Sequence, residues 1–355
     1  MLVRGDDGTA YGWAAYSPES QIRARMWTFE PDAAVDADFV TSQVVAAAAR
    51  RSQLLTSGIT DSARLVFSEA DGLPGLIADL YGDTVVCQLT TAGAEAWREV
   101  LANALVGLPG VSRVYERSDA EVREREGLGA RTGPMAGPAP TEALVAHEAE
   151  GSYAVDITGG HKTGFYLDQR EGRSAVAQWA GGRRVLNVFG YTGAFSVIAA
   201  RCGADSIETI DSSGPALAMA AHNAELNGVD IGELIEADAF TALRGLRDRA
   251  RQYDLILLDP PKLAATEGQV EKASRAYKDL NLLAVKLLAP AGVLMTWSCS
   301  GAMPMELFQK VVAGAALDAK RTVRIIGRLH QPPDHPIPLT FPEAEYLKGL
   351  VLQAE

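Results

Sequence analysis

The pattern of apolar and polar positions changes near residue 150, and the part that follows alternates short apolar runs with helical stretches. Strand and helix in alternation indicate a parallel sheet with helices on both faces. We therefore predict an α/β fold for residues 151–355, a Rossmann-like domain with a mostly parallel, seven-stranded sheet. Its predicted strands are 185–188, 206–210, 234–237, 255–258, 293–298, 323–327 and 347–352. Asn227-Gly228 is predicted to end the second helix, and Pro290-Ala291-Gly292 to form the turn before the fifth strand.

The first 150 residues show shorter elements. Residues 21–27 alternate apolar side chains with arginines, which is the period of a half-buried strand, and residues 36–56 keep a helical period up to Gly58. Gly82-Asp83 is a hairpin signal. The other predicted elements are strands at 64–68, 84–90 and 111–115 and a helix at 95–105. We predict a partial β segment at residues 1–35 and a small α+β domain at residues 36–150.

Two Gly-Pro pairs, Gly133-Pro134 and Gly137-Pro138, lie near the end of this first half. Gly and Pro together are typical of loops and turns. We therefore expect these pairs to lie in the connection between the domains.

The stretch from Val185 to Ser196 predicts a strand, a turn bracketed by Gly190 and Gly193, and the start of a helix. Glycine has no Cβ, so a ligand can approach such a backbone closely, and the free N–H groups of the helix face it. The spacing Gly-x-x-Gly differs from the Gly-x-Gly-x-x-Gly that seats a pyrophosphate. This turn therefore predicts a nucleotide-type cofactor site without a dinucleotide.

Asp211 ends the next predicted strand, about twenty residues further on, where a carboxylate holds the ribose hydroxyls in this topology. A ribose without a pyrophosphate suggests S-adenosylmethionine as the cofactor. Alone, Asp211 could equally be a helix cap, and a glycine turn between strand and helix is common. The residues that follow the other strands decide between these interpretations.

Ligands of such sheets bind beyond the carboxyl ends of the strands, so all residues at these positions should meet in one crevice. The short polar segments found there are 190–193, 211–212, 238–239, 259–262 and 299–300. In Asp259-Pro260-Pro261-Lys262, two prolines fix the direction of the chain, and a rigid carboxylate suits recognition of a planar base. Enzymes that methylate an exocyclic amino group usually have an aromatic residue in place of Lys262, which disfavours that reaction and leaves carbon methylation open.

Carbon 5 of a pyrimidine is a poor nucleophile, and its methylation requires a thiolate that adds to C6. Cys299 follows the fifth predicted strand between Ser298 and Ser300, in a polar turn whose N–H groups favour a thiolate. We predict that Cys299 is the nucleophile. Cys87 and Cys202 lie in apolar stretches and are predicted to be packing residues.

Composition excludes several other classes of protein. Hydrophobic residues make up 47% and charged residues 22%, no apolar run has the length of a membrane span, and no signal pattern is present at the N-terminus. We therefore predict a cytoplasmic protein with no membrane partner. The three cysteines match no paired metal-ligand spacing, so no metal is expected.

The net charge of −12 has the wrong sign for a protein that binds nucleic acid over its whole surface. An RNA substrate would need a local basic patch, although arginines on a solvated face are an alternative interpretation. The candidates for that patch are Arg23, Arg25, Arg113, Arg117, Arg123 and Arg125.

Several motifs together resemble one known family. They are the segment Gly160 to Arg170, the glycine turn, Asp259 to Lys262, Ser298-Cys299-Ser300, Ala15 to Pro18 and Asp71 to Gly75. The chain is similar over nearly its whole length to the RlmI-type ribosomal RNA large-subunit methyltransferases, which make 5-methylcytosine in 23S rRNA. The resemblance implies an N-terminal PUA RNA-binding domain, a central α+β domain and a class I methyltransferase domain. The family's PUA domain needs more chain before Tyr11, so residues 1–35 are expected to hold only its last strands.

The resemblance also implies roles for individual residues. The segment from Lys162 to Arg170 would wrap the cofactor, Asp211 would hold the ribose, and Asp238 and Ala239 would flank the adenine. The complete set predicted to bind S-adenosylmethionine is Lys162, Thr163, Tyr166, Asp168, Gln169, Arg170, Asn187, Phe189, Gly190, Tyr191, Thr192, Gly193, Asp211, Ser212, Asp238, Ala239, Asp259 and Pro260. The predicted catalytic residues are Cys299, Asp259 and Lys262.

Two other functions stay open. Guanine-N7 methyltransferases of ribosomal RNA share a segment similar to residues 162–168, and in such an enzyme Cys299 would be a packing residue. A non-catalytic RNA-binding or ribosome assembly factor is the alternative from another class. The predicted partner in each case is large-subunit ribosomal RNA, and a homodimer is left open.

Overall fold

The computed structural model describes residues 1–119, 121–140 and 143–355. The chain divides into two compact units. The N-terminal unit comprises Met1–Ala149, Ala154–Leu167 and Pro333–Pro342, and the C-terminal unit comprises Glu150–Tyr153, Asp168–Pro332 and Glu343–Glu355. Two segments beyond residue 150 therefore pack with the N-terminal unit, whereas the sequence analysis expects one boundary there.

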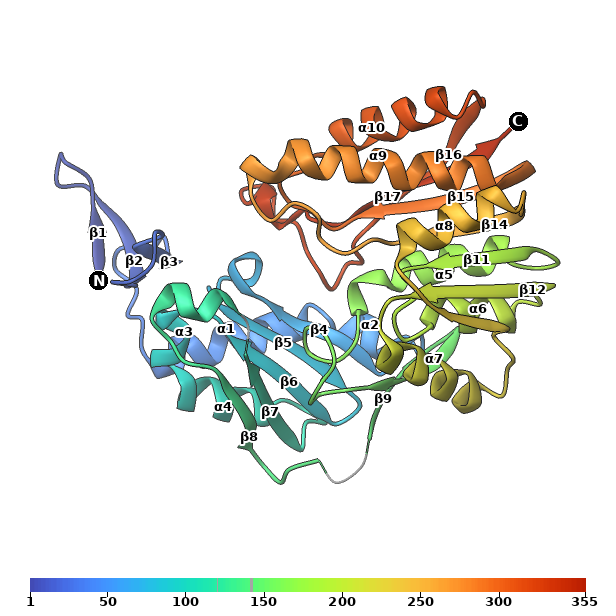
Figure 1. The fold of residues 1–355 in the computed structure, drawn as a ribbon. Helices are drawn as coiled ribbons and strands as arrows, with labels where there is room; N and C mark the ends of the chain where they lie inside the picture. Colours follow the sequence, from blue (N-terminus) through green and yellow to red (C-terminus); the bar gives the residue numbers. More distant parts are fainter. Residues whose placement is uncertain (120, 141–142) are drawn as a thin grey trace. The chain divides into compact units, whose positions relative to one another are not determined.

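The N-terminal unit begins with three antiparallel strands (Figure 1), β1 (Leu2–Arg4), β2 (Ala10–Tyr16) and β3 (Ala24–Thr28). The strand expected at residues 21–27 is β3, which begins three positions later. Trp27 of β3 is buried and belongs to the same apolar core as the strands and helices that follow. This β segment is therefore packed against the rest of the unit.

A five-stranded sheet forms the centre of the N-terminal unit, in the order β4-β5-β6-β7-β8. Its strands are β4 (Ser62–Phe67), β5 (Leu76–Tyr81), β6 (Thr84–Leu89), β7 (Arg113–Ser118) and β8 (Arg131–Ala136). The helices are α1 (Ala37–Ala49), α2 (Ser52–Thr56), α3 (Ala92–Ala96) and α4 (Arg98–Val106). A further two-stranded sheet consists of β9 (Leu144–Glu148) and β10 (Gly151–Val155). The predicted hairpin is confirmed, because Gly82 (φ 58°) and Asp83 join β5 to β6.

Two expectations for this unit are wrong. The helix expected at residues 36–56 starts after its N-cap Asp36, but it is broken into α1 and α2 at Arg51, whose buried guanidinium pairs with Asp71. The connection expected at Gly133-Pro134 is the strand β8. Because β8 is the edge strand, Pro134 can lack an N–H without leaving a central ladder bond unmade.

The C-terminal unit contains the predicted seven-stranded sheet, in the order β13-β12-β11-β14-β15-β17-β16. Its strands are β11 (Arg184–Val188), β12 (Ser206–Asp211), β13 (Glu233–Glu236), β14 (Tyr253–Leu258), β15 (Leu288–Ser298), β16 (Val323–His330) and β17 (Lys348–Ala354). The first five in chain order run parallel, whereas β17 is antiparallel to both β15 and β16. The α/β class and the strand positions are thus confirmed for this part of the chain.

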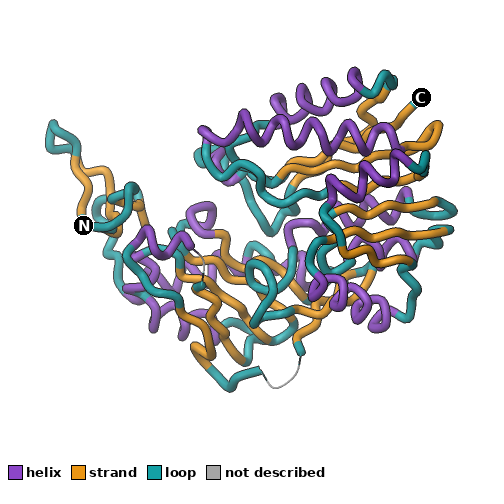
Figure 2. The backbone as a smooth tube through the Cα atoms, in the orientation of Figure 1, coloured by secondary structure: helices purple, strands orange, loops and turns teal. Residues whose placement is uncertain are grey.

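Helices cover both faces of this sheet. They are α5 (Arg170–Trp179), α6 (Ala194–Arg201), α7 (Gly214–Asn227), α8 (Ala239–Asp248), α9 (Val270–Leu287) and α10 (Met305–Asp318). Figures 1 and 2 show α8, α9 and α10 on one face and α5, α6 and α7 on the other. The apolar core between sheet and helices includes the fully buried Leu186, Ile256 and Leu294 of the central strands. This core holds the carboxyl ends of β11, β12, β14 and β15 at one edge.

Two turns predicted from the sequence can be compared with the structure. Gly228 ends α7 in the left-handed conformation (φ 63°), as Asn227-Gly228 predicts. The segment Pro290-Ala291-Gly292 lies inside the span of β15, where Ala291 has φ 56° and the pairing with β14 shifts register.

Among the described residues, none of the helices combines the length and apolar character that crossing a membrane requires.

Candidate cofactor and catalytic site

The turn after β11 has the tight backbone that the sequence predicts. Phe189 (φ 62°), Tyr191 (φ 47°) and Gly193 (φ 75°) all take the left-handed conformation, and Gly193 N–H donates to the Gly190 carbonyl at 2.8 Å. Gly193 is the N-cap residue of α6 and offers no side chain to cap the helix. The first N–H groups of α6 are therefore available to a ligand.

Gly190 is required by packing below the turn. A Cβ at this position would lie 2.3 Å from Cγ2 of Thr209. Beneath it, Asn187 Nδ2 donates to Ser196 Oγ at 2.8 Å, and Ser196 Oγ lies 2.7 Å from Thr209 Oγ1. This buried polar network ties β11, α6 and β12 together and holds the turn close to the sheet.

Asp211 lies beside the glycine turn and is hydrogen-bonded to its backbone. Tyr191 N–H donates to Asp211 Oδ2 at 2.8 Å, and Ser213 N–H donates to Oδ1 at 2.9 Å. Ser213, not Asp211, caps α7 by accepting from Ala216 N–H at 3.2 Å. The carboxylate therefore stands between the two loops that follow β11 and β12, and its contact with a ribose stays a prediction.

Asp238 acts as a helix cap. It accepts from Thr241 N–H at 2.9 Å and from the Thr241 hydroxyl at 2.8 Å at the start of α8. These hydrogen bonds from Thr241 lower the pKa of the Asp238 carboxyl below its usual value. Contact of Asp238 and the buried Ala239 with an adenine stays a prediction.

Asp259 follows β14 and is oriented by a residue distant in sequence. Gln169, which is buried just before α5, donates from Nε2 to Asp259 Oδ2 at 2.8 Å. On the same segment, Asp168 accepts from the Tyr346 hydroxyl at 2.6 Å. The sequence analysis names Asp168, Gln169 and Asp259 but misses Tyr346 and the pairing itself. Pro260 is buried and Lys262 is exposed at the surface.

Thr192, Arg170 and Ser212 are the remaining residues of the C-terminal unit that are predicted to bind S-adenosylmethionine. Asn223 of α7 donates from Nδ2 to the Thr192 carbonyl at 2.8 Å and so supports the glycine turn from below. Arg170 is buried, whereas Ser212 is exposed. The glycine cradle, the uncapped start of α6 and the adjacent Asp211 carboxylate together fit a nucleoside with ribose hydroxyls. These residues are therefore suited to hold S-adenosylmethionine.

The turn that carries Cys299 is fixed by hydroxyl groups on both sides of it. Ser298 Oγ donates to the hydroxyl of Tyr277 (α9) at 3.0 Å, and the same hydroxyl lies 3.2 Å from Ser300 Oγ. Ser300 Oγ accepts from Ala264 N–H at 3.1 Å. The segment that follows Asp259 is thus hydrogen-bonded to the cysteine turn, as the expected meeting of strand ends requires.

The environments of the three cysteines differ. Cys299 is half-buried at the end of β15. Cys87 is fully buried, and burial raises the pKa of its thiol well above the usual range. Burial also raises the pKa of Cys202, at the end of α6. These shifts disfavour the thiolate form of Cys87 and Cys202, which fits packing roles.

Three of the predicted cofactor residues belong to the N-terminal unit. Thr163 is buried and donates to Asp79 Oδ2 at 2.6 Å, and its hydroxyl lies 2.9 Å from that of Tyr81. Lys162 Nζ lies 4.2 Å from the centroid of the Tyr166 ring. Thr163 therefore has a structural role in its own unit, and cofactor contact by these three residues stays a prediction.

Five of the six arginines predicted to form an RNA-binding patch are bonded to other groups of the protein: Arg23, Arg25, Arg113, Arg117 and Arg123. Arg117 is buried and donates to the Gly160 carbonyl at 2.7 Å, which removes it from any surface patch. Arg25 pairs with Glu126 at 2.8 Å, and Arg23 is exposed and donates to the Pro18 carbonyl. Arg113 pairs with Asp83 at 2.9 Å.

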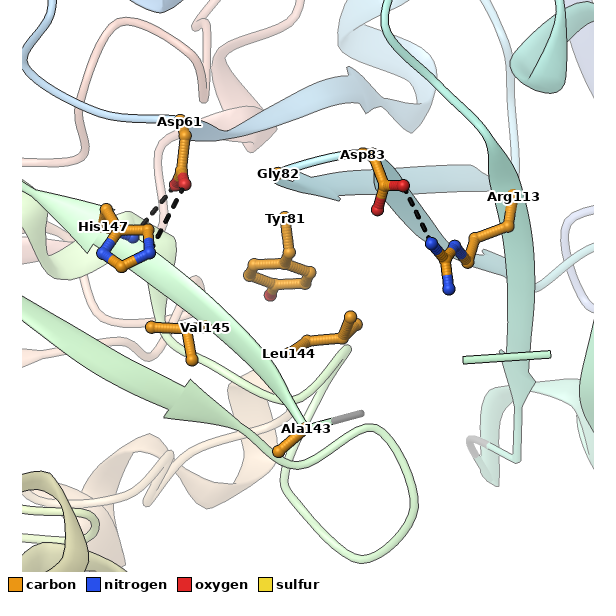
Figure 3. Close-up of a pocket in the computed structure, with 9 residues that line it drawn as sticks. All are labelled: Asp61, Tyr81, Gly82, Asp83, Arg113, Ala143, Leu144, Val145 and His147. Carbon is orange, nitrogen blue, oxygen red and sulfur yellow. Dashed lines mark hydrogen bonds and ion pairs between the residues drawn. The ribbon is translucent and has the colours of Figure 1, made fainter. Parts of the chain in front are cut away.

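Arg113 also lines a cavity of about 390 Å³ in the N-terminal unit (Figure 3). Figure 3 shows Asp61 beside His147 on one side of this cavity and the Asp83–Arg113 pair on the other. Its lining contains none of the residues predicted to bind S-adenosylmethionine or to act in catalysis. The strand-end residues of the C-terminal unit remain the candidate site.

Replacing Asp211 by alanine is expected to weaken S-adenosylmethionine binding by about 10- to 100-fold, because a hydrogen bond to a charged group contributes about 1.5–3 kcal/mol. Isothermal calorimetry would measure the dissociation constant. Asp230→Ala is a matched control, because Asp230 also accepts a local backbone N–H, from Gly232 at 2.8 Å, but lies away from the glycine turn. Affinity of the Asp211→Ala protein within twofold of wild type would contradict the ribose role.

Comparison with known proteins supports S-adenosylmethionine as the cofactor. Residues 134–352 match a model of the S-adenosylmethionine-dependent methyltransferase family. The chain is 48% identical over 352 residues to ribosomal RNA large subunit methyltransferase I of Shewanella denitrificans, covering 98% of this chain and 88% of that protein. It is 48% identical over 354 residues to the Aeromonas salmonicida protein of the same name, covering 99% and 89%.

A solved structure from Streptococcus mutans, assigned as a SAM-dependent methyltransferase, has the same fold. It superposes with a TM-score of 0.87 at 22% identity and covers 99% of this chain and 90% of that one. The chain therefore belongs to the ribosomal RNA large subunit methyltransferase I family of S-adenosylmethionine-dependent methyltransferases.

Proposed function

We propose that this methyltransferase transfers a methyl group from S-adenosylmethionine to C5 of a cytosine in large-subunit ribosomal RNA. The names of the relatives that are 48% identical support ribosomal RNA as the substrate. The observation that supports C5 is the position of Cys299, on a hydrogen-bonded turn joined through Ser300 and Ala264 to the segment that follows Asp259.

The proposed reaction begins when the Cys299 thiolate adds to C6 of the cytosine, forming an S–C6 bond and raising the electron density at C5. S-adenosylmethionine supplies an electrophilic methyl group when it is bound. C5 then forms the bond to this methyl group, and the methyl–sulfonium bond breaks. The C5 proton then passes to solvent water, its electron pair forms the C5=C6 double bond, and the S–C6 bond breaks with its electron pair returning to sulfur, which releases 5-methylcytosine and the Cys299 thiolate. Each bond that Cys299 forms is thus broken again within one turnover.

Other residues serve binding and orientation in this proposal. Asp259, held by Gln169 at 2.8 Å, positions the base, and Lys262 stands at the exposed end of the same segment. Asp211 and the glycine turn hold the cofactor. C5 and C6 must be reached from the edge and face of the base, so a target within a helix would have to be flipped out. The first 150 residues, with a PUA-like β segment at residues 1–35, are proposed to contribute RNA contacts, among which Arg23 has an exposed side chain.

The test is a covalent trap. The protein would be incubated with labelled S-adenosylmethionine and 23S rRNA that carries 5-fluorocytidine, and the peptides would be identified by mass spectrometry. Fluorine at C5 cannot leave as a proton does, so a nucleotide adduct on the Cys299 peptide is expected. Unmodified rRNA is the control, and it should yield labelled 5-methylcytidine without a stable adduct. Label in 7-methylguanosine, or in no nucleoside, would contradict the proposal.

A further inference from the structure

Lys348 is a buried lysine beside the turn that carries Cys299. It begins β17 and pairs directly with Ser298, the last residue of β15, so the two side chains lie on the same face of the sheet. Its residue is 2% exposed, which is rare for a lysine without a carboxylate partner. Such a position calls for a specific reason.

The ammonium group of Lys348 is hydrogen-bonded to the backbone of the cysteine turn. Nζ donates to the Ser300 carbonyl at 2.8 Å and to the Met303 carbonyl at 2.8 Å. Met303 N–H in turn donates to the Ser300 carbonyl at 3.0 Å. An ammonium group has three N–H donors. Two of them bond to these carbonyls, and the third has no acceptor among the described residues. The charge is therefore fixed next to the residue that follows Cys299.

Several charged or titratable groups interact with this ammonium. Burial lowers the pKa of Lys348 to about 8, while Glu345 and Cys299 act in the opposite direction and Lys262 adds to the lowering. On the α9 side, burial raises the pKa of Tyr277, and Cys299 raises it further. Within the described part of the chain, no salt bridge is formed by Lys348. The Glu345 carboxylate and an ionised Cys299 thiol are thus two groups whose negative charge would stabilise this buried cation.

We propose that Lys348 is the positioning residue of the cysteine turn, whose buried ammonium holds the Ser300 and Met303 carbonyls in place and stabilises the thiolate form of Cys299. This inference rests on the proposed role of Cys299 as nucleophile. A lysine or arginine near a cysteine favours the thiolate, which is the reactive species. The same cation would keep the thiolate available after each turnover, when the S–C6 bond breaks.

The experiment is the pH dependence of Cys299 alkylation by iodoacetamide in the full-length protein, followed for each cysteine peptide by mass spectrometry. In the wild-type protein we expect the midpoint for Cys299 to lie below about 8.5, the value of an ordinary thiol. Lys348→Met removes the charge and should raise this midpoint by about one pH unit, so that alkylation at pH 7 is about tenfold slower. Lys348→Arg keeps the charge and should leave the midpoint close to that of wild type.

Ser300→Ala is the matched control. It removes the hydroxyl bonds to Tyr277 and Ala264 from the same turn without changing a charge, so a purely structural disturbance would appear here as well. We expect its alkylation midpoint to stay within about 0.3 pH units of wild type. Should Lys348→Met fail to fold, Lys348→Gln, which keeps a donor for the carbonyls, replaces it. A wild-type midpoint at or above 8.5, or a folded uncharged variant with an unshifted midpoint, would overturn the proposal.

The two proposals fail separately. An adduct on Cys299 in the 5-fluorocytidine trap together with an unshifted midpoint in Lys348→Met would leave cytosine methylation intact and remove the role of Lys348. A low midpoint that depends on Lys348, with no label in 5-methylcytidine, would leave an activated thiol whose substrate is not cytosine.

Discussion

Replacement of Cys299 by serine is expected to lower the rate of methyl transfer to ribosomal RNA by at least about 10⁴-fold, the scale of loss when a catalytic nucleophile is removed. A serine hydroxyl is not ionised near neutral pH and cannot add to C6 as a thiolate does. S-adenosylmethionine binding should stay within twofold of wild type, because the glycine turn and Asp211 lie after other strands than Cys299. Transfer of labelled methyl groups and calorimetric binding would be measured on the same preparation.

Cys202→Ser is the matched control for this substitution. Cys202 is half-buried like Cys299 but closes α6, so its replacement should leave methyl transfer nearly unchanged. Full activity of Cys299→Ser would exclude the covalent mechanism. Guanine-N7 methylation, in which Cys299 only packs, would then be the first alternative to examine.

The second large effect concerns stability. Asp79→Ala is expected to lower the free energy of unfolding of the N-terminal unit by about 3–5 kcal/mol, because removal of one partner leaves a buried charge uncompensated. Asp79 is fully buried and accepts from Arg64 Nε and Nη2, both at 2.8 Å, and from the Thr163 hydroxyl at 2.6 Å. Denaturant unfolding followed by circular dichroism would measure the loss.

The Asp83–Arg113 pair provides the comparison, because it joins the same residue types at a similar distance, 2.9 Å, near the surface. Asp83→Ala should lower the free energy of unfolding by no more than about 1 kcal/mol, which is the usual contribution of an exposed ion pair. Equal losses for the two variants would show that burial of the Arg64–Asp79 pair does not set its energetic importance.

The centre of the C-terminal sheet could be predicted because its strand β14 is apolar on both faces, whereas the outer strands β13 and β16 are half-buried or exposed. The run Leu255 to Leu258 is fully buried between two helical layers, and such a run has few alternatives to a central strand. β8 was missed because a Gly-Pro pair usually marks a loop, and only the neighbouring strands show that β8 is an edge strand. The break at Arg51 has no local sequence signal, because the Asp71 carboxylate that pairs with the Arg51 guanidinium is brought close only by the fold.

The same distinction applies to the candidate site. The sequence predicts Asp211, Asp259 and Cys299 as site residues because each ends or directly follows a strand, a position that the sequence pattern itself reveals. Gln169 bonds to Asp259 from 90 positions away in the chain. On either side of Cys299, Ser298 is bonded by Tyr277 from 21 positions away, and Ser300 by Lys348 from 48 positions away. No local pattern distinguishes these three from other buried polar residues. Gln169 was named only through the resemblance, and Tyr277 and Lys348 were not named.

The position of β17 between β15 and β16 has a consequence for folding. β16 precedes β17 in the chain, yet it contacts the rest of the sheet only through β17, which is docked against β15. That docking also brings Lys348 to the Ser300 and Met303 carbonyls. Pairings between strands distant in sequence close large loops and form slowly. The contacts of Lys348 with the turn that carries Cys299 therefore form only together with the long-range pairing of β15 and β17.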